Sequence, residues 1–441
     1  MGRKPVNIDT IVMGLITNDD MAHKRVVAKK ISDLAYKKGI YLSSIHEFYA
    51  ARGKGEMKGF TVPAFNLRSM TYDLARAMFR VAKKNNAGAF IFEIAKSEMG
   101  YTAQPPVEYS AVILAAAIKE GYSGPVFVQG DHFQVNAKKF QEDQEKEVEG
   151  LQALITDAIG AGFYNIDIDS STVVDLSKAD VKKQQYYNYA VCAQLTQFIR
   201  RIEPKGITVS VGGEIGEVGH KNSTPEDLRA FMNGYSERLR KGLTGISKIS
   251  IQTGTSHGGV VLPDGTIAQV KLDFDTLKTL SELARGEFGM AGAVQHGAST
   301  LPSEAFHKFA ECDAAEVHLA TEFQNMIYDS KHFPKELKDK IYEWLKVNAA
   351  SERKEGQTDE QFFYTSRKKA LGPFKKDIMG LPQDIRDAIA GEIENRFDFL
   401  FKQLNAVNNK SLVDKYVTLK RVIVRKHKQS SELHHDGEGA D

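Results

Sequence analysis

Apolar residues in this chain follow two alternating patterns between Gly59 and about residue 330. Short, nearly continuous apolar runs are each followed by a longer segment in which apolar residues recur every three or four positions. The first pattern is typical of buried parallel strands and the second of amphipathic helices. Together they predict eight strands, at residues 60–65, 87–95, 125–129, 163–169, 207–215, 247–253, 291–295 and 314–319.

Eight strands, each followed by a helical pattern, predict an α/β fold of the (β/α)8 or TIM-barrel class. The alternation takes about 270 residues, an ordinary length for one such barrel. A doubly wound open sheet is the competing fold, but its usual GxGxxG sequence after the first strand is absent. Polar residues at the C-terminal ends of several predicted strands also favour the barrel, because barrel enzymes place their chemistry there.

The segments on either side of this alternation have a different pattern. Near the N-terminus, Val27, Ile31 and Leu34 recur at helical spacing, and residues 53–55 are predicted to form a linker. The chain is therefore expected to divide into four parts: an N-terminal helical extension at 1–55, the (β/α)8 barrel catalytic domain at 56–330, a helical C-terminal extension at 331–429 and a disordered tail at 430–441.

The composition is that of a globular protein, and the formal net charge of +2 implies no polyanionic partner. The basic stretch at 415–428 favours a solvated helical cap or oligomer surface over a nucleic-acid site. The only two cysteines, Cys192 and Cys312, exclude a disulfide framework and a CxxC zinc knuckle. Because no signal segment and no long apolar run are present, we expect a cytoplasmic protein without membrane contact. We also expect a homo-oligomer, either a dimer or a tetramer.

Between residues 245 and 301, two histidines that are each followed by a glycine are the main candidates for metal ligands. His257 follows the sixth predicted strand and His296 follows the seventh, while His132 stands next to Asp131 at the end of the third. Each histidine taken singly is at least as well explained as a structural hydrogen-bonding group. Three imidazoles at strand ends of one barrel, however, predict a site for Zn²⁺ or another divalent transition metal.

Carboxylates stand at the neighbouring strand ends. Asp169 ends the fourth predicted strand and Glu214 lies in the fifth, so both could join the imidazoles as metal ligands. Asp131, adjacent to a candidate ligand, is placed to move a proton during bond making or breaking. The other polar groups at strand ends are a further histidine and small residues suited to an anionic phosphate: His318, Gly258, Gly297, Ser299 and Thr321.

The motifs occur in a fixed order: GDH at 130–132, IDSS at 168–171, GGEIGEVG at 212–219, GTSHG at 254–258 and QHGAST at 295–300. This order resembles the class II, zinc-dependent fructose-bisphosphate aldolase family. The sequence VPAFN at 62–66 resembles the first strand of that family. The resemblance covers roughly residues 60–325 and implies a TIM barrel with a catalytic metal and a phosphorylated sugar as substrate.

The resemblance also implies a role for individual residues. His132, His257 and His296 match the catalytic metal ligands, and Asp169 and Glu214 match carboxylates near an alternative metal position. Asp131 matches the acid that handles the C4 hydroxyl proton. Five positions match substrate-binding groups, most of them for the phosphate of dihydroxyacetone phosphate: Asn66, Gly258, Gly297, Ser299 and Thr321.

Departures from the family pattern concern the surroundings of these residues. The motif near the eighth strand is commonly Asn-x-Asp-Thr, whereas residues 318–321 here read His-Leu-Ala-Thr. A lysine often found after GTSHG is missing, the strand-two serine is replaced near Ala95, and the loop after GEIGEVG lacks the usual paired acids. The stretches EIAKSEMGYT and VHLATEFQ instead resemble the companion subunit of tagatose-bisphosphate aldolase, a related barrel.

These observations predict an aldehyde-lyase. The expected reaction is reversible aldol cleavage of a phosphorylated ketose, fructose 1,6-bisphosphate or a related sugar phosphate, to dihydroxyacetone phosphate and an aldehyde. The alternative hypothesis is a non-catalytic barrel subunit that binds and stabilises a catalytic aldolase partner. A third, weaker hypothesis is another barrel lyase or isomerase that acts on a related sugar.

Overall fold

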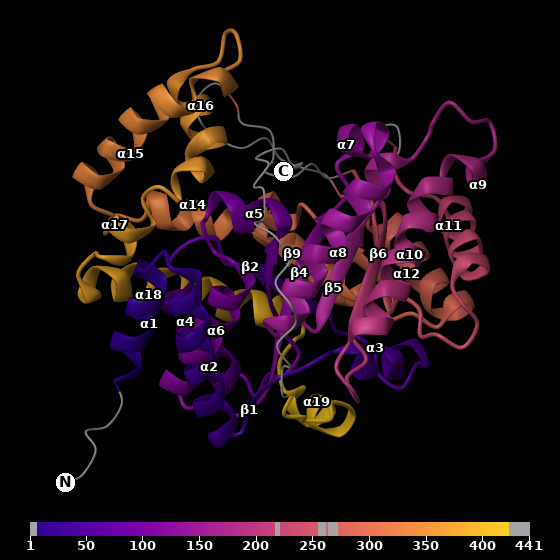
Figure 1. Ribbon diagram of the computed structural model, residues 1–441, viewed down its shortest axis with the longest axis horizontal. Coiled ribbons are helices and arrows are strands. Elements are labelled where there is room, and N and C mark those ends of the chain that lie inside the picture. The colour runs from indigo at the N-terminus through magenta and orange to yellow at the C-terminus, as the bar shows by residue number, and fades with distance from the viewer. Residues whose placement is uncertain (1–6, 217–220, 255–261, 263–271, 423–441) are drawn as a thin grey trace.

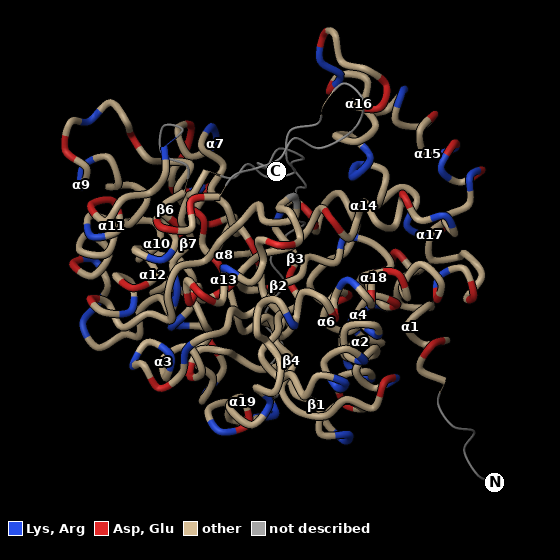
Figure 2. Tube along the Cα trace, turned by 180° about the vertical axis from the view of Figure 1, so that it is seen from behind, with Lys and Arg blue, Asp and Glu red and all other residues tan. Residues whose placement is uncertain are grey.

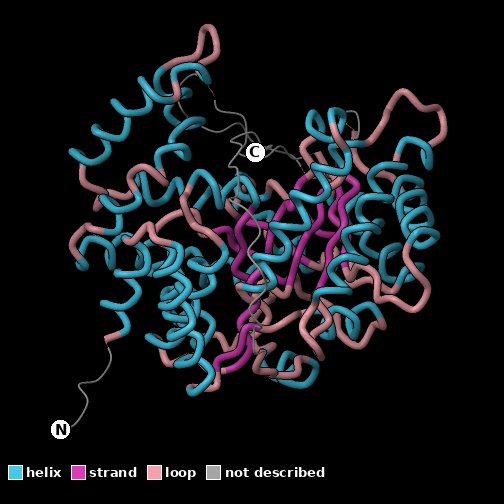
Figure 3. Tube along the Cα trace, viewed as in Figure 1, coloured by secondary structure: helices cyan, strands magenta, loops and turns pink. Residues whose placement is uncertain are grey.

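The computed structural model describes residues 7–216, 221–254, 262 and 272–422, and its centre is a closed barrel of parallel strands (Figures 1 and 3). Each strand pairs with the next along the chain, and the last pairs with the first, so the barrel has no open edge. The predicted TIM barrel is confirmed. Its strands are β2 (Val62–Asn66), β3 (Ile91–Ala95), β4 (Gly124–Gln134), β5 (Asn165–Asp169), β6 (Ser210–Gly216), β7 (Lys248–Ile251), β8 (Ala293–Gln295) and β9 (Glu316–Leu319).

All eight predicted strands are present, but most begin later than the apolar runs that predicted them. In the run at 87–95, Gly88 and Ala89 precede the strand, because their backbone N–H groups donate to the side chain of Asn409, at 2.7 and 3.1 Å. Strand β4 is longer than predicted, since it continues past Gln129 to Gln134. This longer strand also pairs with a segment outside the barrel.

Helices surround the barrel on its outside (Figure 3). They cover the strands with apolar faces, which form one continuous core between the helical layer and the barrel wall. The helices of the barrel region are α4 (Thr71–Lys84), α5 (Lys96–Tyr101), α6 (Pro106–Lys119), α7 (Ala137–Glu142), α8 (Gln144–Gly160), α9 (Val181–Gln184), α10 (Tyr186–Ile202), α11 (Pro225–Arg238), α12 (Phe274–Phe288), α13 (His307–Glu311) and α14 (Thr321–Asp329).

The N-terminal extension contains more structure than its sequence pattern predicts. The helical spacing of Val27, Ile31 and Leu34 belongs to α2 (Met21–Lys37), which packs on α6 beside the unpredicted α1 (Ile8–Thr17). Strand β1 (Ile40–Leu42) then pairs in parallel with the beginning of β4. The extension therefore joins the barrel through both a helical contact and a strand contact.

Helix α3 (His46–Gly53) occupies part of the region predicted as a linker. Its fully buried Arg52 donates to Asp313 at 2.7 Å and to the Ala314 carbonyl at 2.9 Å. A Cβ at Gly53 would lie 2.0 Å from the carbonyl oxygen of Gly289, so this glycine permits a close approach of two backbones. The linker prediction is wrong at Gly53, because tertiary packing rather than flexibility explains this glycine.

The C-terminal extension is helical, as predicted. Its helices are α15 (Lys335–Asn348), α16 (Asp359–Ser366), α17 (Lys375–Met379), α18 (Gln383–Gln403) and α19 (Lys410–Tyr416). Helix α18 packs along α4, where Arg386 forms a buried ion pair with Asp73 at 2.8 Å. Helices α15 and α16 stand to one side of the barrel in Figure 1, and acidic and basic residues are interspersed along the outer helices in Figure 2. The tail at 430–441 lies outside the described residues.

The two ends of the barrel are finished differently. At the N-terminal ends of the strands, α3 and α19 pack on a compact apolar cluster that includes Phe48, Phe60 and Val413. The predicted site residues that the structure describes gather at the opposite end, where the strands finish. Among the described residues, no helix is long and apolar enough to cross a membrane.

Candidate metal centre

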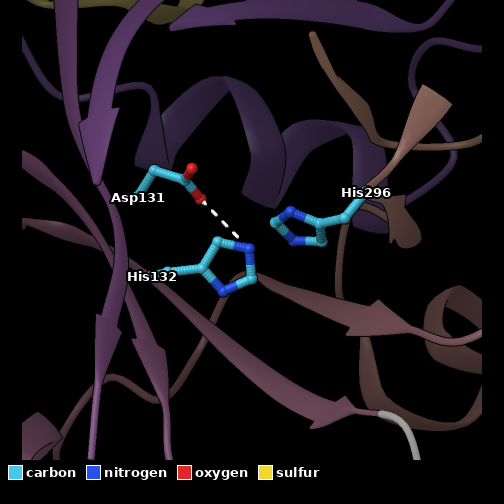
Figure 4. Close-up of side chains that lie close together, drawn as sticks. All are labelled: Asp131, His132 and His296. Carbon is cyan, nitrogen blue, oxygen red and sulfur yellow. Dashed lines mark ion pairs between the residues drawn. The ribbon is translucent and has the colours of Figure 1, made fainter. Parts of the chain in front are cut away.

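A bulge in β4 brings two consecutive side chains to the mouth of the barrel. Three steps along β4, from Gly130 to Phe133, match two steps along β5, and His132 has a positive φ of 39°. Consecutive strand residues normally point to opposite faces, and a bulge removes that restriction. Glycine at 130 suits the bulge, because a Cβ there would lie 2.4 Å from the Phe133 ring. Figure 4 shows the side chains of Asp131 and His132 both directed toward His296.

His296 reaches the same place from the other side of the barrel. It directly follows β8, and its Nε2 lies 3.0 Å from the hydroxyl of Ser250 on β7. Its ring centroid is 4.2 Å from that of His132. Nε2 of His132 lies 3.8 Å from Oδ1 of Asp131. The structure therefore brings His296 next to the adjacent residues Asp131 and His132, from which more than 160 positions of sequence separate it.

The predicted carboxylates lie on the other side of the His132 ring. Nδ1 of His132 is 3.3 Å from Oδ2 of Asp169 and 3.4 Å from Oε2 of Glu214. Gln134 donates to Asp169 at 2.6 Å, and the Ser171 hydroxyl donates to it at 2.7 Å. Asp169 is thereby fixed by its neighbours on β4 and after β5.

The pKa values of His132, Glu214 and Asp131 are shifted by burial and by neighbouring charges, the first two upward and the third downward. Burial alone would lower the pKa of His132, but Asp131 and Glu214 outweigh it and raise this pKa well above its usual range. Burial, with the nearby charge of Asp169, raises the pKa of Glu214 to about 7. Burial would also raise the pKa of Asp131, yet the adjacent histidines hold it well below its usual value. The cluster is thus a concentration of buried, mutually dependent charges.

These residues fit a zinc-type ion by chemistry and by spacing. One ligand atom from each of Asp131, His132 and His296 lies within 4.8 Å of the others, and the same holds for His132, Asp169 and Glu214. Zn²⁺ binds histidine nitrogen and carboxylate oxygen at about 2.0–2.2 Å, so ligands of one ion lie at most about 4.4 Å apart. Small side-chain rotations would bring either group to that spacing.

Of the other predicted site residues, some lie beside the acid or at strand ends, and two lie outside the described residues. Asn66 donates from Nδ2 to Oδ2 of Asp131 at 2.9 Å, so it contacts the candidate acid directly. Thr321 begins α14 and accepts a hydrogen bond from Arg68 at 3.2 Å. Gly297 has a φ of 68° and begins a short turn, in which the Ser299 hydroxyl accepts from the Ala320 N–H at 2.9 Å. His257 and Gly258 lie outside the described residues.

A second polar network, not predicted from the sequence, fills the barrel below these groups. Lys248 is buried and binds Gln129, Asp167 and Glu316, at 2.9, 2.8 and 2.5 Å. A side chain at position 212 would meet Asp167 at 2.3 Å, so glycine there leaves room for this ion pair. The sequence signal was present, because these charged residues interrupt otherwise apolar strands. Only the closed barrel shows that they point to one place.

Comparison with known proteins assigns the family. The model of the family described as fructose-bisphosphate aldolase class-II matches residues 51–376, somewhat more than the 60–325 expected from motifs. The comparison with curated proteins found no matching sequence.

One solved structure superposes with a TM-score above 0.5 at low sequence identity, and two others superpose less well. A probable tagatose 6 phosphate kinase from Sinorhizobium meliloti superposes with a TM-score of 0.55 at 13% identity, covering 80% of this chain and 99% of that one. The YdjI aldolase from Escherichia coli (TM-score 0.46, 14% identity) covers 83% of this chain and 98% of its own. The fructose-bisphosphate aldolase from Campylobacter jejuni (TM-score 0.46, 18% identity) covers 84% and 96%. Such identities speak to the fold alone, whereas the family match spans most of the barrel and its site: the chain belongs to the class II fructose-bisphosphate aldolase family.

Proposed function

We propose that this protein is a metal-dependent aldolase that reversibly cleaves a phosphorylated ketose, fructose 1,6-bisphosphate or a related sugar phosphate, to dihydroxyacetone phosphate and an aldehyde. One observation carries the proposal. Asp131, His132 and His296 converge at the mouth of a barrel that belongs to the class II aldolase family. An acid beside two imidazoles is what metal-assisted aldol chemistry requires from the protein.

His132 and His296 would hold the metal, with His257 as the third ligand implied by the family pattern. Asp169 and Glu214 would offer an alternative position on the other side of His132. Zn²⁺ held there would supply Lewis-acid chemistry, that is, polarisation of a substrate carbonyl and stabilisation of negative charge developing beside it. His296 and Asp169 are buried, and the side chains of His132 and Glu214 are only 14% exposed, so the access of bulk water to the reacting atoms is restricted.

Asp131 would move the proton at the C4 hydroxyl of the ketose. In the cleavage direction its carboxylate accepts that proton as the C3–C4 bond breaks. The C4 oxygen becomes an aldehyde, and the electron pair of the broken bond stays on C3, which becomes part of the dihydroxyacetone phosphate half. In the condensation direction the carboxylate returns the proton to the same oxygen. Asn66 orients the carboxylate by its hydrogen bond to Oδ2. Gly297, Ser299 and Thr321, at the ends of β8 and β9, would bind the substrate phosphate.

The decisive test is metal content measured together with aldol cleavage. The purified protein would be assayed on several ketose bisphosphates and monophosphates, before and after a chelator, and again after Zn²⁺ is restored. We expect cleavage that is lost with the metal and regained with it. Full activity of the metal-free protein would refute the proposal.

The same experiment separates the proposal from the alternative of a non-catalytic subunit. A barrel subunit that only supports a catalytic partner would not cleave any of these substrates alone, with or without Zn²⁺. It would instead raise the activity or stability of an added catalytic class II aldolase. Light scattering on the same sample would test the proposed dimer or tetramer.

A further inference from the structure

His318 is not among the predicted metal ligands, yet it lies at the centre of the contacts beneath them. Its side chain is only 3% exposed, and its ring centroid is 4.2 Å from that of His296. Its two ring nitrogens lie near four buried carboxylates, of which those of Asp131 and Glu316 are the nearest. Nδ1 lies 3.2 Å from Oδ1 of Asp131, and Nε2 lies 2.9 Å from Oε2 of Glu316. Nδ1 is also 3.3 Å from Oε1 of Glu93, and Nε2 is 3.8 Å from Oδ2 of Asp167. The ring therefore bridges the candidate acid and the lower network.

The lower end of this bridge is rigidly held. Glu316 receives the ammonium of Lys248 on Oε2 at 2.5 Å, and the hydroxyl of Tyr49 donates to Oε1. Lys248 comes from β7 and Tyr49 from α3, so two separate elements fix one carboxylate. Because all of these side chains are buried, water does not compete for their hydrogen bonds.

The upper end of the bridge is Asp131, whose two oxygens are held separately. Asn66 donates to Oδ2 at 2.9 Å, and His318 faces Oδ1 at 3.2 Å. A carboxylate held on both oxygens cannot rotate freely about its Cβ–Cγ bond. A proton-transfer group needs such fixed geometry, because small misplacements lower the rate strongly.

We propose that His318 is a positioning residue that holds the Asp131 carboxylate in its orientation for proton transfer, anchored through Glu316 on Lys248 and Tyr49. The catalytic part of this inference rests on the proposed aldolase function, whereas the bridge between Asp131 and Glu316 does not. His318 acts through Asp131 and not on the substrate. Its effect on catalysis should therefore disappear when Asp131 can no longer exchange a proton.

A double-mutant cycle tests that dependence. The full-length zinc-loaded protein would be compared with His318→Asn, Asp131→Asn and the double variant, measuring kcat, KM and zinc content. We expect His318→Asn to lower kcat roughly 10–100-fold, the usual effect of losing an orienting partner, with KM and zinc content nearly unchanged. In the Asp131→Asn background the same change should have almost no effect. Losses that multiply in the double variant would overturn the proposal.

A measurement without turnover keeps the inference separate from the aldolase proposal. In the zinc-loaded protein labelled with ¹⁵N-histidine, the buried Nδ1–H of His318 should give a downfield ring N–H resonance that is missing in His318→Asn. Asp131→Asn should shift this resonance, because the acceptor changes from a carboxylate to an amide. An unchanged resonance would overturn the proposal.

The two readouts distinguish the two failures. If the parent protein cleaves no sugar phosphate but the resonance shifts, the aldolase proposal fails and the bridge is supported. If the parent is active but the losses multiply, the aldolase proposal stands and the positioning role fails. His307→Ala serves as a control, since its 47%-exposed side chain lies far from the barrel interior on α13 and should change neither readout. His318→Gln provides a second variant if His318→Asn does not fold.

Discussion

Two layers of buried charge lie one above the other inside the same barrel, and they are balanced in different ways. In the lower layer, Lys248 lies between Asp167 and Glu316, at 2.8 and 2.5 Å. In the upper layer, His132 lies between Asp169 and Glu214, at 3.3 and 3.4 Å. The two layers use partly the same strands, since Asp167 and Asp169 are alternate residues of β5.

The difference lies in where the positive charge comes from. The lower layer carries a permanent cation on its own lysine, which pairs with both Asp167 and Glu316. Within the described residues, the ion-pair partners of Asp131, Asp169 and Glu214 are all histidines. Histidine can give up its proton and bind a metal instead, whereas a buried, paired lysine cannot take that role. The comparison teaches that the lower layer serves stability and that the upper layer is suited to metal-dependent chemistry.

The largest expected effect is on the acid of the upper layer. Asp131→Asn keeps the size and most hydrogen bonds but cannot exchange a proton, so turnover at saturating metal should fall by roughly 10²–10⁴-fold. Metal content and stability should stay close to those of the parent. If Asp131 only orients His132, adding metal should restore nearly parental turnover, and steady-state kinetics against Zn²⁺ concentration would show it. Asp339→Asn, at an exposed ion pair on α15, is the matched control.

Removal of the lysine tests the lower layer. Lys248→Met leaves Asp167 and Glu316 buried without their cation, which should reduce the free energy of unfolding by about 3–5 kcal/mol. Urea unfolding followed by circular dichroism measures this change. Lys182→Met breaks an exposed pair with Glu237 and should cost less than about 1 kcal/mol. A stable Lys248→Met protein that no longer binds Zn²⁺ would contradict the division of roles between the layers.

A ligand change tests the upper layer without touching the lower one. Loss of a residue that only orients a metal ligand typically lowers metal affinity by about 10–100-fold. His296→Ala should lower Zn²⁺ affinity by more than this, because it removes a ligand itself, and activity should fall with the affinity. The fold should survive, because the apolar core lies outside and below the site. Competition with a chelating dye measures the affinity. Zn²⁺ affinity equal to that of the parent would refute the ligand assignment.

His46, at the other end of the barrel, differs from the histidines of the site in the direction of its pKa shift, and it gives the smallest of the expected effects. Burial, with the nearby Arg200, lowers the pKa of His46 to about 4, whereas the carboxylates raise those of His132 and His318. A histidine with a lowered pKa in the folded state stabilises the fold fully above about pH 6.5, and this contribution disappears as the pH falls toward 4. The loss should amount to about 3 kcal/mol.

Unfolding measured across that pH range in the parent and in His46→Gln tests the contrast. The variant should have a flatter dependence of stability on pH, because glutamine does not titrate. Identical pH dependence in the two proteins would show that His46 is protonated in the folded state as readily as in the unfolded chain.

The sequence by itself determined the eight strands, their order and the end of the barrel at which the described candidate site residues lie. These features depend on the local spacing of apolar residues, because a buried parallel strand is a nearly continuous apolar run wherever it lies in the chain. It also identified His132 and His296 as strand-end histidines. It did not reveal α3, whose short pattern is explained only by contacts such as that of Arg52 with Asp313.

Only the tertiary structure decided which polar side chains meet. Alternation along β4 would have sent Asp131 and His132 to opposite faces, and the bulge that unites them depends on pairing with β5. The bridge from Lys248 through Glu316 to His318 and Asp131 likewise joins residues from different strands. Local sequence fixes the regular alternation of side chains along a strand. Strand register, bulges and barrel closure fix what each side chain faces, and those are set by contacts between residues far apart in the chain.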